Sequence, residues 1–296
     1  MVIIVVPATT ANLGPGFDCL GAALSLYARF SFELRPEGLV ITGGEQKEAN
    51  ENNLVYRAYL HTLQSCGLKS SGLMMQIDSD IPPARGLGSS AACIAGGILG
   101  ACALHRLDMD QEEVFALAAA LEGHPDNAAP AVFGGLRVSI QEGSKPYSLP
   151  AVLHPSLRFL ALVPDFELKT AAARAALKAY VTREDAVYNL SHTAFLIKAL
   201  EEGDPEMIRL ACRDRLHQPA RFGLIPGSLA LKEQMEQAGA AACYLSGAGP
   251  TLMCLYTKPS FPDTIVPIIK ADFPRFTAMP LKLCGRGAAI ERNNEK

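Results

Sequence analysis

The sequence lacks any long apolar run. In its 296 residues, no apolar run approaches the length of roughly 18 residues that a membrane helix needs. Residues 2–6 are apolar, but this stretch is too short for a secretory signal and no basic residues precede it. We expect residues 2–6 to form a buried strand, in a cytoplasmic protein with no membrane partner.

A basic stripe is also missing. Lys and Arg number 27 against 30 Asp and Glu, which gives a formal net charge of −3 at pH 7. Proteins that bind nucleic acid neutralise its phosphates with clustered Lys and Arg. The charge pattern therefore argues against nucleic acid as the main partner.

The eight cysteines form no C-x-x-C pair, which is the spacing typical of zinc and redox sites. Most of them lie within apolar runs, where a free thiol behaves as a small hydrophobic side chain. We interpret them as reduced core residues, in agreement with a cytoplasmic location.

Hydrophobic residues make up 49% of the chain and charged residues 19%, which is typical of a well-packed globule. Alternating apolar residues predict strands at 28–34 and 73–77. Asn53 is placed to cap one helix, and Asp110 with Glu113 forms a capping box for another that runs to about Glu122.

Residues 142–155 contain one glycine and three prolines, and we place a domain boundary there. This divides the chain into residues 1–150 and 151–296. The second part contains predicted strands at 159–163, 242–245 and 252–256, helices at 170–212, 227–238 and 262–271, and a final strand. Strands and helices do not alternate regularly, so the sequence favours a two-lobed α+β fold.

The glycine-rich segment 82–92 follows a predicted strand and precedes a predicted helix of small residues, 91–104. Gly86 and Gly88 permit close backbone approach, and the free N–H groups at a helix start attract anions. The segment has no lysine, which excludes a Walker A loop. It fits a loose G-x-G-x-x-A dinucleotide pattern, but two prolines and a missing acidic residue argue against that. The remaining alternative is a turn before a close-packed helix.

Two further segments gather polar groups between apolar stretches. Residues 7–21 read as a long loop after the first strand, with Asn12 and Asp18 as binding groups or, alternatively, as turn residues. Residues 122–127 read as an acidic loop that ends a helix. Its carboxylates suit Mg²⁺, and the alternative is helix punctuation.

In the second half, Thr170 and Arg174 lie four residues apart and share one helix face. Arg221 follows His217 with the same spacing, and residues 245–251 form a glycine loop between two apolar strands. A guanidinium can hold a carboxylate or phosphate, although single arginines are more often solvated at a surface.

The motif P-x-x-x-G-L-G-S-S-A at residues 82–91 resembles the central signature of the GHMP kinases. Within that superfamily, the opening P-A-T-T-A-N-L-G-P-G-F-D at 7–18 and the segment E-G-H-P-D-N at 122–127 resemble the homoserine kinases. The patterns T-x-x-x-R at 170–174 and H-Q-P-x-R at 217–221 also match them, and residues 246–251 match the third GHMP motif.

The resemblance implies a fold, an activity and two cofactors. The fold would be two-lobed, with a left-handed βαβ unit in the amino-terminal lobe and a ferredoxin-like carboxy-terminal lobe. The activity would be ATP- and Mg²⁺-dependent phosphorylation of L-homoserine to O-phospho-L-homoserine, a step of threonine biosynthesis. The partner would be this small substrate, with a homodimer as the one assembly considered.

The resemblance also implies a role for individual residues. The ATP site comprises Pro82, Pro83, Ala84, Arg85, Gly86, Leu87, Gly88, Ser89, Ser90, Ala91, Ala92 and Thr170, and the Mg²⁺ ligands are Glu122 and Ser89. The substrate site comprises Asn12, Asp18, His124, Asn127, Arg174 and Arg221. The catalytic residues are Asn127, Asp126 and Arg174.

Asp126 has two alternative roles. It is either a general base, as the matching residue of mevalonate kinases is read, or a support for Asn127. Phosphoryl transfer needs little help from a base, so we favour positioning by Asn127. Two other functions stay open: a GHMP kinase for another small alcohol, and a non-catalytic ligand sensor on the same fold. The intact Glu122, Asp126 and Asn127 argue against the sensor.

Overall fold

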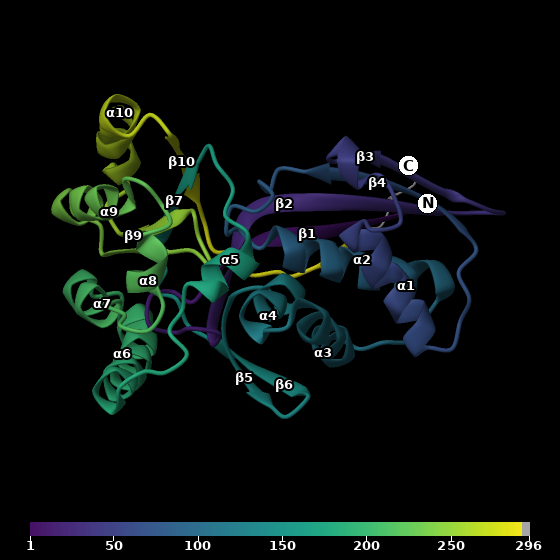
Figure 1. Cartoon of the computed structure of the whole chain (residues 1–296), viewed down its shortest axis with the longest axis horizontal. Helices are drawn as coiled ribbons and strands as arrows, with labels where there is room; N and C mark the ends of the chain where they lie inside the picture. The colour runs from purple at the N-terminus through teal and green to yellow at the C-terminus, as the bar shows by residue number, and fades with distance from the viewer. Residues whose placement is uncertain (292–296) are drawn as a thin grey trace.

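A computed structural model describes residues 1–291 and shows two lobes, each built on one sheet (Figure 1). The first sheet has the order β11-β1-β2-β4-β3, and β2 also pairs with the β5–β6 hairpin. Its strands are β1 (Val2–Ala11), β2 (Leu20–Arg35), β3 (Leu39–Gly43), β4 (Gly72–Ser79), β5 (Leu136–Glu142), β6 (Lys145–Ala151) and β11 (Ala289–Glu291). Its helices are α1 (Leu54–Ser65), α2 (Ser89–His105), α3 (Gln111–Glu122) and α4 (Pro125–Phe133).

The second sheet has the order β10-β7-β9-β8, and every neighbouring pair is antiparallel. Its strands are β7 (Arg158–Pro164), β8 (Ala242–Leu245), β9 (Leu252–Tyr256) and β10 (Phe276–Leu281). The helices of this lobe are α5 (Thr170–Ala175), α6 (Arg183–Glu202), α7 (Pro205–Ala211), α8 (Gln218–Phe222), α9 (Ser228–Gln237) and α10 (Phe261–Asp272). Strand, helices and strand occur twice, which is the β-α-β-β-α-β arrangement of a ferredoxin-like lobe.

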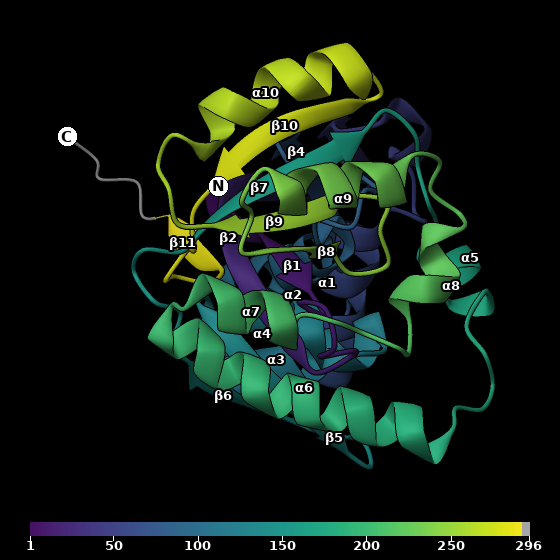
Figure 2. The same ribbon diagram turned by 90° about the vertical axis from the view of Figure 1, so that its left-hand side faces the viewer.

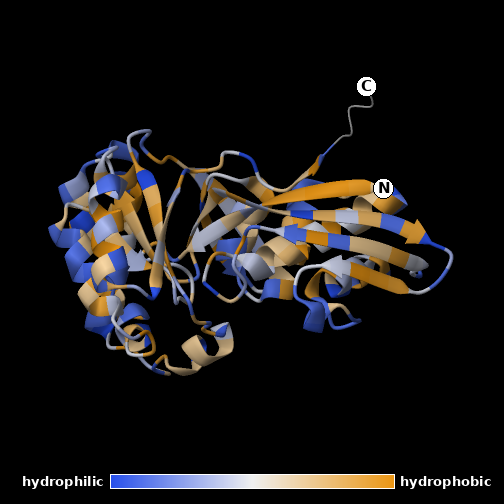
Figure 3. Ribbon diagram, turned by 90° about the horizontal axis from the view of Figure 1, so that it is seen from above, coloured by the Kyte–Doolittle hydropathy of each residue, from blue (hydrophilic) through white to orange (hydrophobic). Residues whose placement is uncertain are grey.

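Hydrophobic faces explain how both sheets are covered. In β2, Phe30 and Phe32 are fully buried, whereas their neighbours Arg29 and Glu33 are exposed. Figure 2 shows α9 and α10 lying across one face of the second sheet. Figure 3 shows mainly apolar strands there and hydrophilic residues on the outer side of the helices. Burying these faces supplies most of the favourable free energy of folding.

Helix α2 lies in the centre of the first lobe, packed between α1 and the sheet. Small residues make this close approach possible. A Cβ at Gly97 would lie 2.3 Å from the backbone oxygen of Val55 and 2.9 Å from the Cβ of Ala58, both in α1. The glycine therefore sets the distance between the two helices, and so holds the start of α2 in place.

Several local predictions are confirmed. Asn53 caps α1 by accepting hydrogen bonds from the N–H groups of Val55 and Tyr56. Asp110 and Glu113 form both bonds of the capping box of α3. The predicted strands and helices of the second half all occur, and the two-lobed α+β fold is confirmed. Leu34, the last of the alternating apolar residues in the predicted strand 28–34, is 44% exposed because it lies near the end of β2.

The chain leaves the first sheet after β6 and enters the second at β7, next to the predicted division at residue 150. The division stays a prediction, because the chain crosses between the lobes more than once. Strand β11 returns to the first sheet and pairs with Ile3–Val5 of β1. The segment 142–155 is also not a simple linker, since most of it forms strand β6 and its hairpin turn.

Within residues 1–291, no helix combines the length and apolar character that crossing a bilayer would require.

Replacing Gly97 by alanine is expected to lower the free energy of unfolding by about 1–3 kcal/mol, because the added methyl overpacks the α1–α2 contact. Urea denaturation measures the change. Gly223→Ala is the matched control, because a Cβ there lies no closer than 3.8 Å to Ala220 and the backbone is right-handed. Equal stability of the two variants would contradict this account of the helix contact.

Candidate active site

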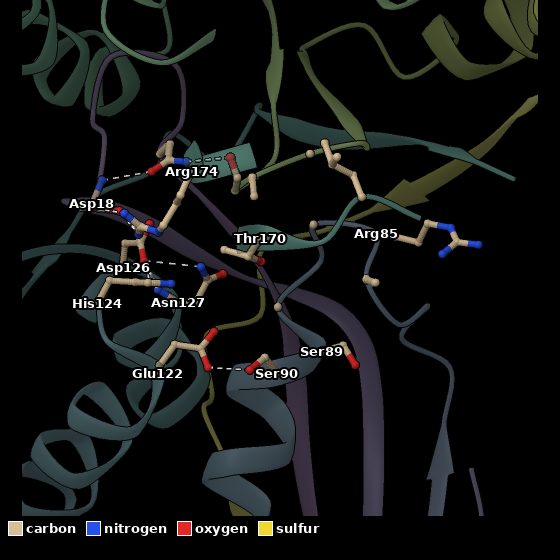
Figure 4. A pocket seen from close by; sticks show the side chains of 18 of the residues that line it. Asp18, Arg85, Ser89, Ser90, Glu122, His124, Asp126, Asn127, Thr170 and Arg174 are labelled. Atoms are coloured by element: carbon tan, nitrogen blue, oxygen red, sulfur yellow. Dashed lines mark hydrogen bonds and ion pairs between the residues drawn. The ribbon is translucent and has the colours of Figure 1, made fainter. Parts of the chain in front are cut away.

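A cleft between the lobes brings together most of the residues that the sequence singled out (Figure 4). Segments from both lobes line it. The lining residues are Asn12, Asp18, Ala84, Arg85, Gly86, Gly88, Ser89, Ser90, Glu122, His124, Asp126, Asn127, Leu168, Thr170, Arg174, Arg221, Gly247, Ala248 and Gly249.

The glycine-rich segment forms one wall of the cleft. Gly88 caps the start of α2 with left-handed backbone angles, φ 70° and ψ 23°, that suit glycine. The first N–H groups of this 17-residue helix therefore open toward the cleft, where they and the helix dipole favour an anion. This geometry suits the phosphates of a nucleotide.

The same segment is held against the second lobe. The Ser246 hydroxyl donates to the Gly86 carbonyl at 2.5 Å, and the Thr251 N–H donates to the Arg85 carbonyl. Arg85 in turn donates from Nε to the Pro164 carbonyl at 3.1 Å, and Figure 4 shows it pointing away from the acidic residues. The loop therefore joins the two lobes, and Arg85 serves this junction.

Not every residue of 82–92 faces the cleft. Leu87, Ala91 and Ala92 are buried in the hydrophobic core, and Pro82 and Pro83 do not line the cleft. These five stay predictions as ATP-site residues, and the three buried ones anchor the loop in the core. Thr170 does line the cleft, at the start of α5.

The prediction of an acidic loop at 122–127 was wrong in its local structure. Glu122 is the last residue of α3, and α4 starts at Pro125, so only Gly123 and His124 lie between two helices. A proline at the first helical position favours this start, because its missing N–H needs no partner there. The tight corner holds the polar groups at fixed positions.

A short hydrogen-bond network occupies this corner. His124 Nδ1 lies 2.5 Å from Asp126 Oδ1, which also accepts from the Asn127 backbone N–H at 2.9 Å. Burial lowers the pKa of His124, but the hydrogen bond to Asp126 and the neighbouring carboxylates outweigh it, and the net pKa is raised. The charged imidazole is therefore more favoured beside Asp126 than in free histidine.

Glu122 offers a carboxylate close to the phosphate wall. Its Oε2 accepts from the Ser90 hydroxyl at 2.6 Å, while Figure 4 shows Ser89 turned to the other side of the helix start. Burial raises the pKa of Glu122, and the hydrogen bond from Ser90 opposes the rise. A partly desolvated carboxylate beside a hydroxyl fits the oxygen ligands that Mg²⁺ prefers.

A second group of possible ligand atoms also lines the cleft. Atoms of Asp18, His124 and Asp126 lie within 4.8 Å of one another. This group suits Mg²⁺ less well, because one donor is an imidazole nitrogen and Asp18 already binds a guanidinium. Glu122 is therefore the better magnesium ligand of the two arrangements.

The loop between β1 and β2 is shorter than predicted. Strand β1 continues to Ala11 after a bulge at Pro7 and Ala8, so only residues 12–19 form the connection. Asn12 and Asp18 both have left-handed backbones, with φ of 70° and 55°, a region in which Asn and Asp are enriched. Asn12 Oδ1 accepts from the Asp18 N–H at 3.0 Å and thereby fixes the loop.

Arg174 forms a two-pronged ion pair with Asp18. Its Nη2 and Nη1 donate to the two carboxylate oxygens at 2.7 and 3.1 Å. The hydrogen bonds that Arg174 donates to Asp18 raise the pKa of Arg174. Both side chains are about one-third exposed at the cleft, so solvent or a bound ion has access to the pair.

Arg221 is buried to 1% exposure, yet it also lines the cleft. Its Nη1 bonds to His217 Nδ1 at 3.0 Å and donates to the Gly247 carbonyl at 3.1 Å. Within residues 1–291, no carboxylate lies within the 4.0 Å of an ion pair with it. Burial lowers the pKa of Arg221, and the charge of Arg174 lowers it further.

Sequence reasoning missed the role of Phe17. Its ring stacks on His217 with a centroid separation of 5.2 Å. The guanidinium carbons of Arg221 and Arg174 lie 5.2 and 5.6 Å from the ring centre. An aromatic face attracts cations, so Phe17 helps to hold two like charges side by side. Its position in the motif at 7–18, next to Asp18, was the signal in the sequence that could have indicated a role at the site.

Comparisons with known proteins agree with this geometry. The family model of the GHMP kinases N terminal domain matches residues 53–135, and that of the GHMP kinases C terminal matches residues 196–274. A homoserine kinase of Clostridium botulinum (strain Kyoto / Type A2) is 40% identical over the full length of both chains. The chain is a GHMP kinase of the homoserine kinase family.

Solved structures support the same assignment for this GHMP kinase. A crystal structure of homoserine kinase from Cytophaga hutchinsonii superposes with a TM-score of 0.87 at 26% identity, covering 98% of this chain and 97% of the other. Mevalonate kinase of L. major, in complex with R-mevalonate, gives 0.75 at 19% identity, with 94% of each chain covered. The latter shows the shared fold alone.

The GHMP kinase contains a buried histidine whose charge state affects stability. His217 Nε2 donates to the Gly14 carbonyl at 2.7 Å, so Nδ1 is the acceptor for Arg221 and the ring is neutral. Burial lowers the pKa of His217, and the Arg221 charge adds to this against the opposing charge of Asp214. Protonation is thus easier in the unfolded chain, so this contribution to stability is present above about pH 6.5 and lost as the pH falls.

We therefore expect the free energy of unfolding to fall less between pH 7.5 and 5.5 in His217→Gln than in the unchanged protein. The expected difference is at most about 1.4 kcal/mol per pH unit, the value for one proton. Urea denaturation at the two pH values measures it, and all other titrating groups are common to both proteins. An identical pH dependence would show that His217 does not titrate as its contacts imply.

Proposed function

We propose that this kinase transfers the γ-phosphate of ATP to the side-chain hydroxyl of L-homoserine, giving O-phospho-L-homoserine. The observation that carries the substrate assignment is Arg221, a buried guanidinium at the cleft with no carboxylate partner in residues 1–291. Asp18, Asp126 and Asp214 stabilise the charge only from beyond ion-pair distance. A buried charge without a direct partner is costly, so this position favours an anionic group of the substrate. The carboxylate of an amino acid supplies it.

Asp18 provides the opposite charge for the ammonium group of the same substrate. It lies on the loop with Asn12, which donates from Nδ2 to the Gly247 carbonyl that Arg221 also contacts. The recognition sites for carboxylate and ammonium are therefore linked through one backbone oxygen. An ammonium group bound to Asp18 would compete with Arg174, which then becomes available to the γ-phosphate.

The hydroxyl of the substrate is expected near His124 and Asn127, between the phosphate wall and the loop 12–19. Asp126 is already engaged by His124 and by the backbone N–H of Asn127 through the same oxygen, Oδ1. This supports the interpretation that Asp126 orients its neighbours and that Asn127 aligns the acceptor. Charge neutralisation and positioning then carry most of the rate, since transfer passes through a loose transition state.

ATP would place its phosphates at the start of α2, with Glu122 and the Ser90 hydroxyl that it binds as the Mg²⁺ site. Ser89, the second ligand that the resemblance implies, faces the other side of the helix start and stays a prediction. When bound, Mg²⁺ would neutralise charge on the phosphate oxygens. Glu122 would hold the ion. Burial raises the pKa of this carboxyl, and a cation beside it would favour its charged form. Arg174 would balance the charge on the transferring group from the other side of the cleft.

The direct test measures ATP consumption with L-homoserine, mevalonate, galactose and shikimate. We expect homoserine to react far faster than the others, and Asp18→Asn to raise its KM roughly 10- to 100-fold, the scale of a hydrogen bond to a charged group. The KM for ATP should stay nearly unchanged. Asp108→Asn, at an exposed position, is the matched control. Equal turnover with mevalonate would refute the substrate assignment.

Glu122→Gln is expected to cost roughly 2–4 kcal/mol of transition-state stabilisation, the scale of one lost electrostatic partner. The kcat measured over a range of Mg²⁺ concentrations shows this loss. Glu112→Gln makes the same change at an exposed position of the same helix and should leave kcat unchanged. Normal turnover of Glu122→Gln in ordinary Mg²⁺ would place the metal ligand elsewhere.

A further inference from the structure

Thr9 lies in β1, within the amino-terminal motif, and is fully buried. It does not line the cleft. Its hydroxyl nevertheless donates to Asn127 Oδ1 at 2.7 Å, across 118 positions of sequence. The residue that we expect to align the acceptor hydroxyl is thus bonded from behind by a strand of the first sheet.

Two partners together determine the orientation of the Asn127 amide. Asp126 Oδ1 lies 3.4 Å from Asn127 Nδ2, and a carboxylate requires the NH₂ side of the amide. The carbonyl side then faces Thr9, whose hydroxyl donates to it. Loss of this donor would leave the amide oxygen unpaired in a buried position and permit the side chain to rotate.

Thr9 is also in contact with the phosphate wall. Its backbone N–H donates to the Leu87 carbonyl at 3.1 Å. A Cβ at Gly88, the residue that caps α2, would lie only 1.8 Å from Thr9 Oγ1. One hydroxyl therefore lies between the glycine at the start of the phosphate helix and the amide at the acceptor position.

We propose that Thr9 is a positioning residue for phosphoryl transfer, which holds the Asn127 amide in its working orientation at a fixed distance from the phosphate loop. This inference rests on the proposed function, because it assigns Asn127 to the acceptor hydroxyl. Thr9 acts through Asn127 and touches neither substrate. Its removal should therefore lower kcat and leave the KM for ATP nearly unchanged.

The test compares Thr9→Val, which replaces the hydroxyl by a methyl of similar size, with Thr9→Ser, which keeps the hydroxyl. We expect kcat with saturating homoserine and ATP to fall roughly 10- to 100-fold in Thr9→Val, the scale of a misplaced reacting group. Thr9→Ser should restore most of it. Thr62→Val is the matched control, since Thr62 is equally buried and donates to the Ala58 carbonyl in α1. If Thr9→Val does not fold, Thr9→Ala removes the same donor without a new methyl group.

A double-mutant cycle with Asn127→Ala separates positioning from a merely structural role. If Thr9 acts through Asn127, then Thr9→Val should cause no further loss of kcat when Asn127 is already alanine. Additive losses, or a Thr9→Val variant with normal kcat, would overturn the inference. If the protein without substitutions does not phosphorylate homoserine, the proposed function is refuted instead. Failure of the inference about Thr9 and failure of the proposed function are therefore distinguishable.

Discussion

The cleft depends on how the second lobe binds the backbone of residues 12–19. The Gly14 carbonyl accepts from His217, and the Pro15 carbonyl accepts from both Asn189 and Thr193. A buried carbonyl without a donor is costly, so these bonds fix the loop in one position. Because Asn12 and Asp18 lie on the same loop, the contacts that join the lobes also place the two groups that we propose to bind the substrate.

The distribution of charge in the cleft follows from that junction. The loop carries one carboxylate, Asp18, to a surface where the second lobe presents Arg174 and Arg221. Phe17, adjacent to Asp18, lies against both guanidinium groups. Carboxylate and ring together offset the repulsion between the arginines, yet no carboxylate of residues 1–291 lies within the 4.0 Å of an ion pair with Arg221. Such a site is complementary to a zwitterion more than to a sugar or a simple alcohol.

Local features of the fold could be predicted from sequence, because each depends on neighbours within a few residues. The caps at Asn53 and Asp110 and the glycine turn before α2 are of this kind. The separate start of α4 was missed, because a Gly-His-Pro corner reads equally well as a loop. Strand β11 was missed as well, since its three residues gain their order only from pairing with β1.

The sequence named many of the residues that line the cleft, but not their pairings. Ser90 bonds to Glu122, and Asp18 to Arg174, across 32 and 156 positions. A resemblance of motifs names residues but does not state which of them form contacts, because those contacts depend on how the chain packs in three dimensions. That is why Asp18 was assigned to an ammonium group alone, while the fold gives it a guanidinium partner as well.

These two interactions of Asp18 bear on how a kinase limits the hydrolysis of ATP when the acceptor is absent. When Arg174 is bound to Asp18, both of its outer nitrogens donate to the carboxylate, so fewer N–H groups are available to a phosphate. An incoming ammonium group competes for the same oxygens and weakens that hold, whereas water carries no charge and does not. In the proposed function, binding energy from a part of the substrate that does not react would thereby be coupled to charge balance at the part that does. The arrangement would then favour an amino acid over water at the transition state as well as in the bound state.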